Sequence, residues 1–161
     1  MRTWSLDDAP AAFRLWGDAE VMRYVGDPHA DLARTRAALA RARAAQDASG
    51  YCVWALQAKD DGELVGACGF HPAGIDSGLT LELVFHIRRE HWGTGFASEA
   101  ARACVDHAFG ELGATRIIAG VRHGNEPSMH ILASLGFDDV GEDGDERLFA
   151  LSAPFRPVDI Q

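Results

Sequence analysis

One segment of the chain switches between strand-like and helix-like patterns in an order that few folds accommodate. Residues 79–87 form a β-rich run in which the two faces of a strand differ in polarity. After a glycine-containing break, residues 96–112 place apolar side chains at helical spacing, and residues 115–121 form another β-rich run. A strand, a helix and a strand at this spacing predict a βαβ unit, with parallel strands and a right-handed crossover.

The flanking regions predict helices before this unit and further strands around it. Residues 5–48 have helix-forming composition. Ser5 and Asp8 are a candidate capping box at the start of this region, and Asp31 is a candidate cap for the longest helix. Further β-rich runs occur at 52–56, 64–70, 137–140 and 147–151. We therefore expect an α/β fold: a strongly twisted mixed sheet of about six or seven strands, mostly antiparallel, with one central parallel pair and helices on both faces. The expected organisation is a single domain over 1–161.

Composition limits the partners that such a chain would bind. The 15 Lys and Arg against 24 Asp and Glu give a formal net charge of −9, which argues against nucleic acid and anionic lipid. Neither a membrane-spanning run nor a signal-like start is recognisable, so the expected location is cytoplasmic. Cys52, Cys68 and Cys104 lie in apolar surroundings, which predicts reduced core thiols and no metal site.

The segment between the two parts of the βαβ unit carries the most chemical information. Gly93 and Gly95 lie at a turn from strand to helix. Such a turn presents backbone N–H groups to a ligand, and the helix N-terminus adds partial positive charge, so a phosphate or pyrophosphate is favoured. The alternative is that these glycines only satisfy the sterics of the turn. The segment lacks both a Walker loop and the dinucleotide fingerprint, which disfavours an NTP or nicotinamide site.

A series of motifs along nearly the whole chain points to one family. In chain order they are Asp7-Asp8-Ala9, Asp18 to Met22, Gly66 to Pro72, Trp92 to Ala100, His107 to Gly113, Asn125 to Ser128 and Leu135-Gly136-Phe137. Together they resemble the GNAT N-acetyltransferases, and in particular the branch similar to ribosomal-protein-alanine N-terminal acetyltransferases. Their joint occurrence in this order is more specific than any one of them.

The resemblance implies acetyl-CoA as the acyl donor, with no metal. The family's pyrophosphate loop, Gln/Arg-x-x-Gly-x-Gly/Ala, corresponds here to Trp92-Gly93-Thr94-Gly95-Phe96-Ala97, in which Trp92 departs from the pattern. It also implies that the pantetheine arm lies along His86 and Ile87, with Asn125 and Ser128 beside the cofactor. Arg88 and Arg89 are either further phosphate ligands or a solvated pair.

Candidate catalytic residues follow from the need to deprotonate an amine. A lysine-like amine has a pKa of about 10.4 and an α-amine about 8, so most of the substrate is protonated near neutral pH. Glu82 is the candidate base, on the strand face that also carries Val84 and His86. The alternative role of Glu82 is a structural ion pair. His86 is an alternative base. Leu132 stands where the family often has a tyrosine acid, which leaves Ser128 or water to protonate the leaving thiolate.

Three interpretations remain open at this point. The leading one is an acetyl-CoA-dependent N-acetyltransferase that acts by direct attack in a ternary complex, as a monomer or homodimer. Its acceptor is a primary amine; the resemblance favours a peptide or protein N-terminal α-amine, and a small amine is the alternative. The second is a non-catalytic acyl-CoA-binding or sensing module, and the third a two-layer α/β domain without a CoA site. Residues 26–31, 71–78 and 141–146 are candidate walls of the acceptor site.

Overall fold

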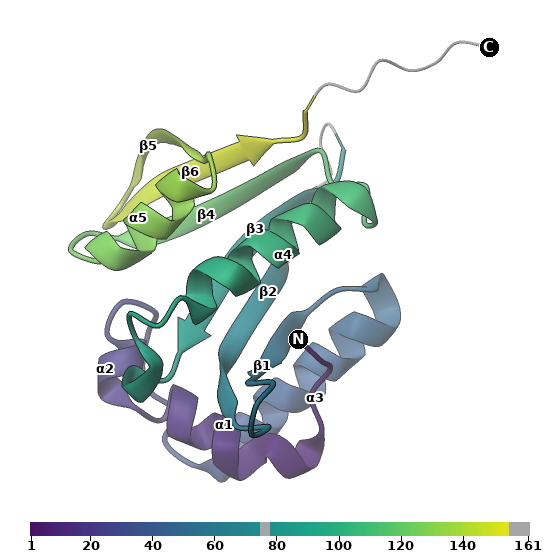
Figure 1. Cartoon of the computed structure of the whole chain (residues 1–161), viewed down its shortest axis with the longest axis vertical. Helices are drawn as coiled ribbons and strands as arrows, with labels where there is room; N and C mark the ends of the chain where they lie inside the picture. The colour runs from purple at the N-terminus through teal and green to yellow at the C-terminus, as the bar shows by residue number, and fades with distance from the viewer. Residues whose placement is uncertain (75–77, 155–161) are drawn as a thin grey trace.

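The computed structural model of the chain describes residues 1–74 and 78–154 (Figure 1). Its elements, in chain order, are η1 (Leu6–Asp8), α1 (Ala9–Trp16), α2 (Ala19–Met22), α3 (Leu32–Ser49), β1 (Val53–Gln57), β2 (Leu64–Gly74), β3 (Thr80–Ile87), η2 (Arg89–His91), α4 (Phe96–Gly110), β4 (Arg116–Arg122), α5 (Glu126–Ser134), β5 (Asp138–Asp143) and β6 (Glu146–Ser152). Within these residues, six strands form one sheet in the order β1-β2-β3-β4-β6-β5. None of the described helices has the length and apolar character that crossing a membrane requires.

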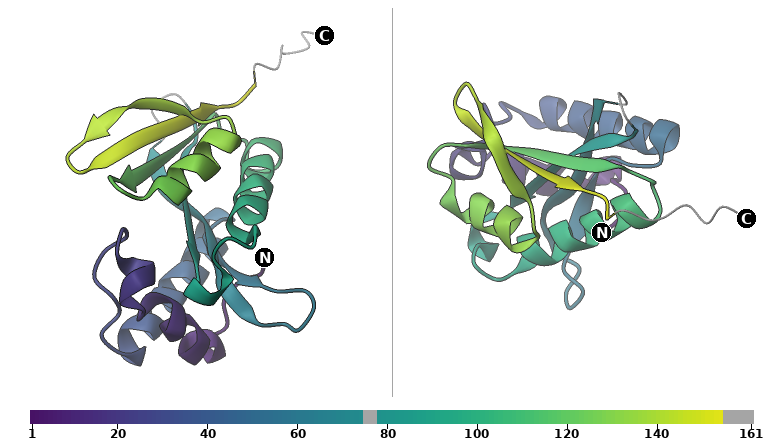
Figure 2. Two further views of the ribbon diagram at one scale, coloured as in Figure 1. Left: turned by 60° about the vertical axis from the view of Figure 1, so that its left-hand side comes forward. Right: turned by 90° about the horizontal axis from the view of Figure 1, so that it is seen from above.

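The pairing of β3 with β4 sets the shape of the sheet. These strands are parallel, whereas the other neighbouring strands are antiparallel, so the predicted fold is confirmed. Their ladder covers only Thr80 to Glu82 on β3, although β3 continues to Ile87. Beyond Glu82 the two strands separate, and Figure 2 shows the part with β4, β5, β6 and α5 inclined away from the part that contains the N-terminal helices.

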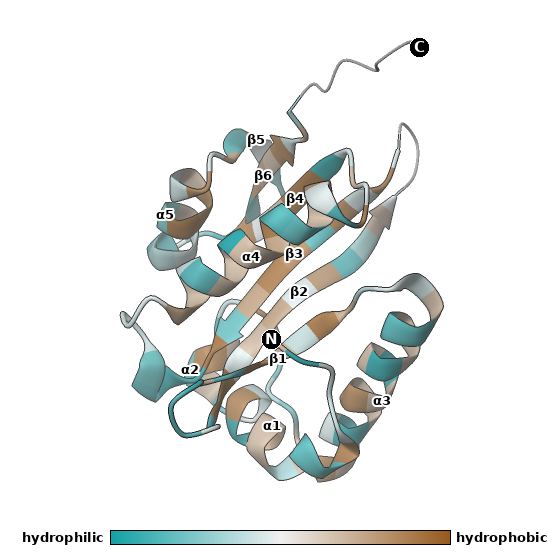
Figure 3. Cartoon of the chain, turned by 45° about the vertical axis from the view of Figure 1, so that its right-hand side comes forward, coloured by the Kyte–Doolittle hydropathy of each residue, from teal (hydrophilic) through white to brown (hydrophobic). Residues whose placement is uncertain are grey.

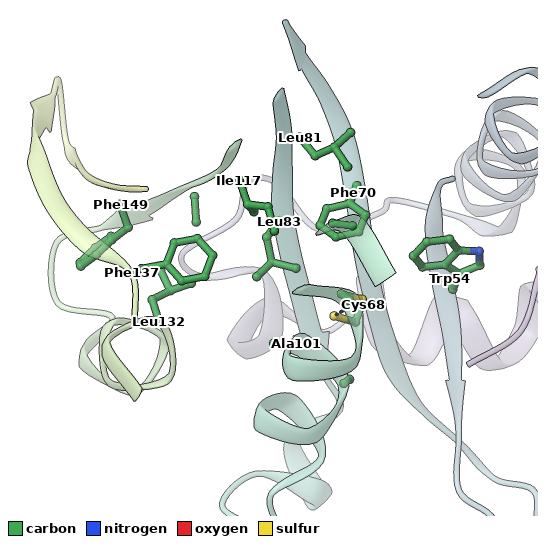
Figure 4. Close-up of a cluster of buried hydrophobic side chains, with 14 of the residues drawn as sticks. Trp54, Cys68, Phe70, Leu81, Leu83, Ala101, Ile117, Leu132, Phe137 and Phe149 are labelled. Carbon is green, nitrogen blue, oxygen red and sulfur yellow. Dashed lines mark hydrogen bonds between the residues drawn. The ribbon is translucent and has the colours of Figure 1, made fainter. Parts of the chain in front are cut away.

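The two faces of β3 serve two different cores. Leu81, Leu83 and Ile87 belong to the cluster that α4 covers, together with residues of β4, β6 and α5 (Figure 4). Val84, on the opposite face, packs against the cluster formed by α1, α3 and the edge of the sheet at β1. Period-two alternation along a strand produces this division. Figure 3 shows hydrophobic residues concentrated on the central strands.

The three cysteines lie in the core, as predicted. Cys52, Cys68 and Cys104 are buried free thiols, and the Sγ atoms of Cys68 and Cys104 are 3.5 Å apart. Burial raises the pKa of the Cys52 thiol to about 11. Thiols that stay protonated in apolar surroundings are poor nucleophiles, which agrees with a packing role.

Local capping explains where the N-terminal helices begin. Ser5 and Asp8 form a reciprocal capping box, in which the Asp8 carboxylate accepts from the Ser5 N–H at 2.8 Å. Asp31 caps α3 by accepting from the Arg34 N–H at 2.8 Å. Gly50 ends α3 with a φ of 78°, a left-handed conformation that favours glycine. Both predicted helix starts are therefore confirmed.

Two strand boundaries differ from the sequence expectation. A strand was expected at 64–70, but β2 continues to Gly74, and residues 75–77 lie outside the described part. Pro72 is compatible with a strand here because β1 has ended, so its missing N–H leaves no ladder bond unmade. A strand was also expected at 137–140, but β5 spans Asp138–Asp143. All its residues are exposed, so no hydrophobic alternation marked its extent.

The parallel pair depends on tight packing at its start. Leu81 lies opposite Ile117 in register, and both are 0% exposed. We expect Leu81→Ala to lower the free energy of unfolding by about 2–5 kcal/mol, because it removes buried methyl groups and leaves a cavity. Urea denaturation measures this change. Val140→Ala, at a position 51% exposed on β5, is the control and should change stability by less than about 0.5 kcal/mol. Equal effects of the two substitutions would contradict the assigned core.

Candidate active site

A cavity of about 720 Å³, here called the cleft, opens where β3 and β4 have separated. The end of β3, the turn before α4, the N-terminus of α5 and the end of α2 line it. Most of the sequence-predicted cofactor residues line this cleft; they are His86, Ile87, Trp92, Gly93, Gly95, Phe96, Ala97, Asn125 and Ser128. Thr94 does not line it, and its hydroxyl donates to the His91 carbonyl at 2.6 Å within the turn.

The turn before α4 leaves room for a ligand against its backbone. Gly93 and Gly95 have φ angles of 73° and 90°, and a Cβ built on either would meet nothing within 4 Å. Gly95 is the N-cap of α4 and supplies no side-chain cap. The first-turn N–H groups of Phe96, Ala97 and Ser98, which line the cleft, therefore combine with the helix dipole to favour an anion.

Trp92 has a structural reason for standing where the family pattern has Gln or Arg. Its indole Nε1–H donates to the Ile87 carbonyl at 2.8 Å, although the residue as a whole is 50% exposed. This bond ties the glycine turn to the last residue of β3. The aromatic ring also contributes to the wall of the cleft.

The structure gives Arg88 a role different from both sequence alternatives. The residue is 7% exposed and does not line the cleft, so it is neither a phosphate ligand nor a solvated cation. Its guanidinium donates to Glu63 at 2.6 Å and to the Leu64 carbonyl at 3.1 Å, and it pairs with Glu90. Arg89 is exposed and also lies outside the cleft lining. The fully paired guanidinium of Arg88 thus joins the start of β2 to the turn after β3.

The same guanidinium accounts for a small acidic cluster. Ligand atoms of Glu63, Glu90 and His91 lie within 4.8 Å of one another. Both carboxylates pair with Arg88, whose charge a metal ion would have to displace. We therefore interpret the cluster as structural.

At the N-terminus of α5, Asn125 is a helix cap and also lines the cleft. Its Oδ1 caps the helix by accepting from the Ser128 N–H at 3.4 Å, and both residues line the cleft. Leu132, at the position of the family's tyrosine, is 0% exposed and belongs to the core. No hydroxyl therefore reaches the cleft from that position.

Sequence analysis missed the contribution of α2 to the cleft. Glu20, Arg23 and Tyr24 line it, although this short helix lies far from β3 along the chain. The Tyr24 hydroxyl would lie 3.6 Å from a Cβ on Gly124, so Tyr24 approaches the loop before α5. The only available sequence signal was an aromatic residue directly after a short helix.

His86 occupies a position shared by the cleft and a second cavity of about 380 Å³. Its Nδ1 lies 3.1 Å from the indole Nε1 of Trp16, which can only donate. Burial, and to a smaller extent the charge of His71, lower the pKa of His86 to about 4. The ring is therefore neutral near pH 7 and carries its proton on Nε2, because Nδ1 is the acceptor.

Glu82 lies on the same face of β3 as His86, directly opposite His71 on β2. Within residues 1–74 and 78–154, its carboxylate makes neither a hydrogen bond nor an ion pair, so these residues do not supply the partner that the alternative structural role requires. Glu82 lines neither cavity. Of the three candidate walls of the acceptor site, residues 141–146 lie outside both linings. The other two contribute to the second cavity, through His29 and through His71 and Pro72.

Comparisons with known proteins agree with this arrangement. Residues 1–138 match the acetyltransferase (GNAT) domain family. An uncharacterized N-acetyltransferase, p20 of Bacillus licheniformis, is 32% identical over 142 residues, which is 88% of this chain and 79% of the relative.

Solved structures of acetyltransferases share the fold. A GNAT-family acetyltransferase from Bacillus anthracis superposes with a TM-score of 0.82 at 24% identity, covering 94% of this chain and 92% of that one. The yncA protein of Salmonella typhimurium, solved with its cofactor acetyl-CoA, gives 0.74 at 22% identity over 98% and 95%. The ribosomal-protein-S5-alanine acetyltransferase of Vibrio fischeri gives 0.78 at 16% identity over 94% and 91%.

These findings support the expected acetyl-CoA-dependent acetyltransferase, and they confirm the family inferred from the motifs. The matched region includes the glycine turn, the whole of α4 and the N-terminus of α5. The chain belongs to the GNAT acetyltransferase family.

Proposed function

We propose that this protein transfers an acetyl group from acetyl-CoA to a primary amine by direct attack in a ternary complex. The observation that carries the proposal is the open glycine turn at a helix N-terminus without a side-chain cap, set in a cleft where β3 has no strand partner on one side within the described part of the chain. The glycine turn at the helix N-terminus suits a pyrophosphate, and the unpaired edge of β3 suits an amide-containing arm.

The cofactor residues follow from this geometry. Gly93 to Ala97 would bind the pyrophosphate through backbone N–H groups, and the edge of β3 at His86 and Ile87 would pair with the pantetheine amides. A backbone edge that leaves its N–H and C=O groups unpaired is a ready acceptor of such an arm. Asn125 and Ser128 would contact the cofactor from the opposite wall.

In this proposal, acetyl-CoA supplies a thioester: the amine nitrogen bonds to its carbonyl carbon and the C–S bond breaks to release CoA thiolate. Glu82 accepts the proton that the amine loses, directly or through water, since its carboxylate has no competing partner among the described residues. Backbone N–H groups near Val84 and Phe85 stabilise the negative charge on the carbonyl oxygen. Ser128, or water, returns a proton to the thiolate.

His86 does not suit the alternative role of base. A proton added at Nδ1 would meet the Trp16 N–H, and the low pKa opposes protonation of the ring. We propose instead that neutral His86 donates a hydrogen bond from Nε2 at the boundary between the cleft and the second cavity.

The remaining features of the proposal come from the sequence and the resemblance. We propose a cytoplasmic single-domain enzyme over 1–161, a monomer or homodimer, with no nucleic-acid partner because of its net charge of −9. The resemblance favours a peptide or protein N-terminal α-amine as acceptor, and a small amine is the alternative.

A second candidate function is a non-catalytic acyl-CoA sensor. It is favoured by the absence of a hydroxyl at Leu132 and by the position of Glu82 outside the lining of the cleft. Incubation with acetyl-CoA and a panel of peptides and amines separates the two candidates. Amine-dependent release of free CoA supports the enzyme, whereas tight acetyl-CoA binding without release supports the sensor.

The glycine turn can be tested by one substitution. We expect Gly95→Val to weaken acetyl-CoA binding at least tenfold, about 1.4 kcal/mol, because its side chain enters the space beside the backbone N–H groups. Calorimetry measures the affinity. Gly113→Val is the matched control, since Gly113 also has a positive φ, 69°, and follows the other end of α4. Similar losses in both variants would mean that backbone strain, and not the site, is responsible.

Glu82 can be tested by an isosteric change. Glu82→Gln should lower turnover by about 10²–10³ with little change in acetyl-CoA affinity, because it removes a proton acceptor without changing side-chain volume. Part of the rate should return at alkaline pH, where more of the amine is already neutral. Glu142→Gln, on the exposed strand β5, is the control. Unchanged turnover of Glu82→Gln across pH would remove Glu82 from the mechanism.

The state of His86 predicts a pH dependence of stability. Its pKa is about 4 in the folded protein and near the ordinary 6.5 when unfolded, so the unfolded chain binds more protons between these values. This difference stabilises the fold above pH 6.5, and the stabilisation is lost as the pH falls toward 4. Imidazole ¹⁵N NMR should show the Nε2–H form at pH 6. An Nδ1–H form there, or titration near 6.5, would disprove the assignment.

A further inference from the structure

The second cavity lies beside the cleft. Several of its polar lining side chains, among them Arg41 and Tyr51, have no role in the proposed acetyl transfer. Its volume is about 380 Å³, and α1, α3 and the adjoining parts of β1 and β2 line it. His86 lines both cavities, so a molecule in the second cavity lies one side chain away from the cleft. The volume suits a small molecule.

Three side chains supply hydrogen-bond donors to this cavity: Arg41, His86 and Tyr51. Arg41 of α3 lines it, and among the described residues no acid pairs with its guanidinium. His86 offers Nε2–H, because its Nδ1 is occupied by Trp16. The buried Tyr51 contributes a hydroxyl that has no hydrogen-bond partner within residues 1–74 and 78–154. Such a lining complements an anionic or acceptor-rich group.

No Asp or Glu stands among the described residues of this lining. The local charge is therefore opposite in sign to the net charge of −9. His29 lines the same cavity. Burial lowers its pKa most, the charges of Arg34 and Arg41 lower it further, and the charge of Asp31 opposes them. A dicationic or polycationic amine would consequently meet repulsion here.

The cavity also adjoins the candidate base. His71 lines it, and Glu82 is the direct cross-strand neighbour of His71. Side chains so paired in an antiparallel ladder have Cβ atoms about 4.5–5.5 Å apart. Glu82 therefore lies at the margin of the cavity. Trp16, Met22 and Phe70 add apolar walls, which suit a compact hydrophobic body.

We propose that this cavity is the acceptor pocket, and that it selects small primary amines that also carry an anionic group such as a carboxylate. Arg41 and the other donors bind the anion, and the amine is directed toward Glu82. The inference rests on the proposed acetyl transfer and narrows its acceptor: a free zwitterionic amine fits, whereas a polyamine does not. A peptide α-amine fits only when a nearby side chain supplies the anion.

The test compares acceptors that differ only in this charge. L-leucine, L-methionine and L-phenylalanine are each assayed beside the corresponding amide, by release of free CoA. Two tripeptides with amidated C-termini, one neutral and one containing aspartate, are assayed in the same way. Removing the carboxylate charge lowers the pKa of the amine, so without selection by the pocket the amides would react faster. We expect kcat/KM to favour at least one free amino acid over its amide by about tenfold or more.

Arg41→Gln identifies the source of that preference. It should lower kcat/KM for the preferred amino acid by about tenfold to a hundredfold and leave that for the amide within about twofold. Arg43→Gln is the matched control, because Arg43 is exposed like Arg41, lies two residues further along α3, and is outside the cavity lining. Calorimetry of the same amino acids in the presence of CoA reports binding independently of turnover.

The outcomes separate the two claims. Arg41-dependent binding of a free amino acid without CoA release would overturn the acetyl transfer and support the pocket. Turnover of amides and amino acids alike, or a preference that survives Arg41→Gln, would overturn the pocket and leave acetyl transfer intact. Reaction of the aspartate-containing tripeptide alone would assign the anion to a peptide side chain instead of a free amino acid. Reaction of the neutral tripeptide alone would reject an anionic acceptor.

Discussion

The separation of β3 from β4 after Glu82 is the constraint on which the rest of the site depends. Where the strands are paired, buried Leu81 and Ile117 hold them together. Beyond Glu82, one edge of β3 has no ladder partner among the residues that the structure describes. An unpaired backbone edge inside a protein needs hydrogen-bond partners, and in this fold a cleft lies against it. The glycine turn and the N-terminus of α4 line the same cleft.

The features that the sequence predicted are those that short-range chemistry determines. The capping of η1 by Ser5, the start of α3 at Asp31 and the glycine turn before α4 follow from a few neighbouring residues. The βαβ unit followed from periodicity, since α4 buries Ala101 and Cys104 against the sheet. The order of motifs, in turn, was sufficient to indicate the family.

Features that join distant segments could not be predicted in this way. The Trp16 indole bonds to His86 across 70 positions of sequence, and this contact decides which nitrogen of His86 carries the proton. Arg88 was a candidate phosphate ligand in the sequence. Its actual partner, Glu63, lies 25 positions earlier, so the neighbouring residues gave no sign of this ion pair. Tyr24 reaches the cleft only because α2 packs beside it. Such contacts depend on tertiary packing, which residue patterns do not encode locally.

The central claim is that the separated edge of β3 and the start of α4 together hold acetyl-CoA. Backbone amide NMR of the protein titrated with acetyl-CoA tests it most directly, because each amide reports its own surroundings. The account predicts that the largest shifts occur at Gly93 to Ser98, at Phe85 to Ile87 and at Asn125 to Ser128, with small shifts on β1 and β5. Saturable shifts concentrated elsewhere, or none at the glycine turn, would contradict it.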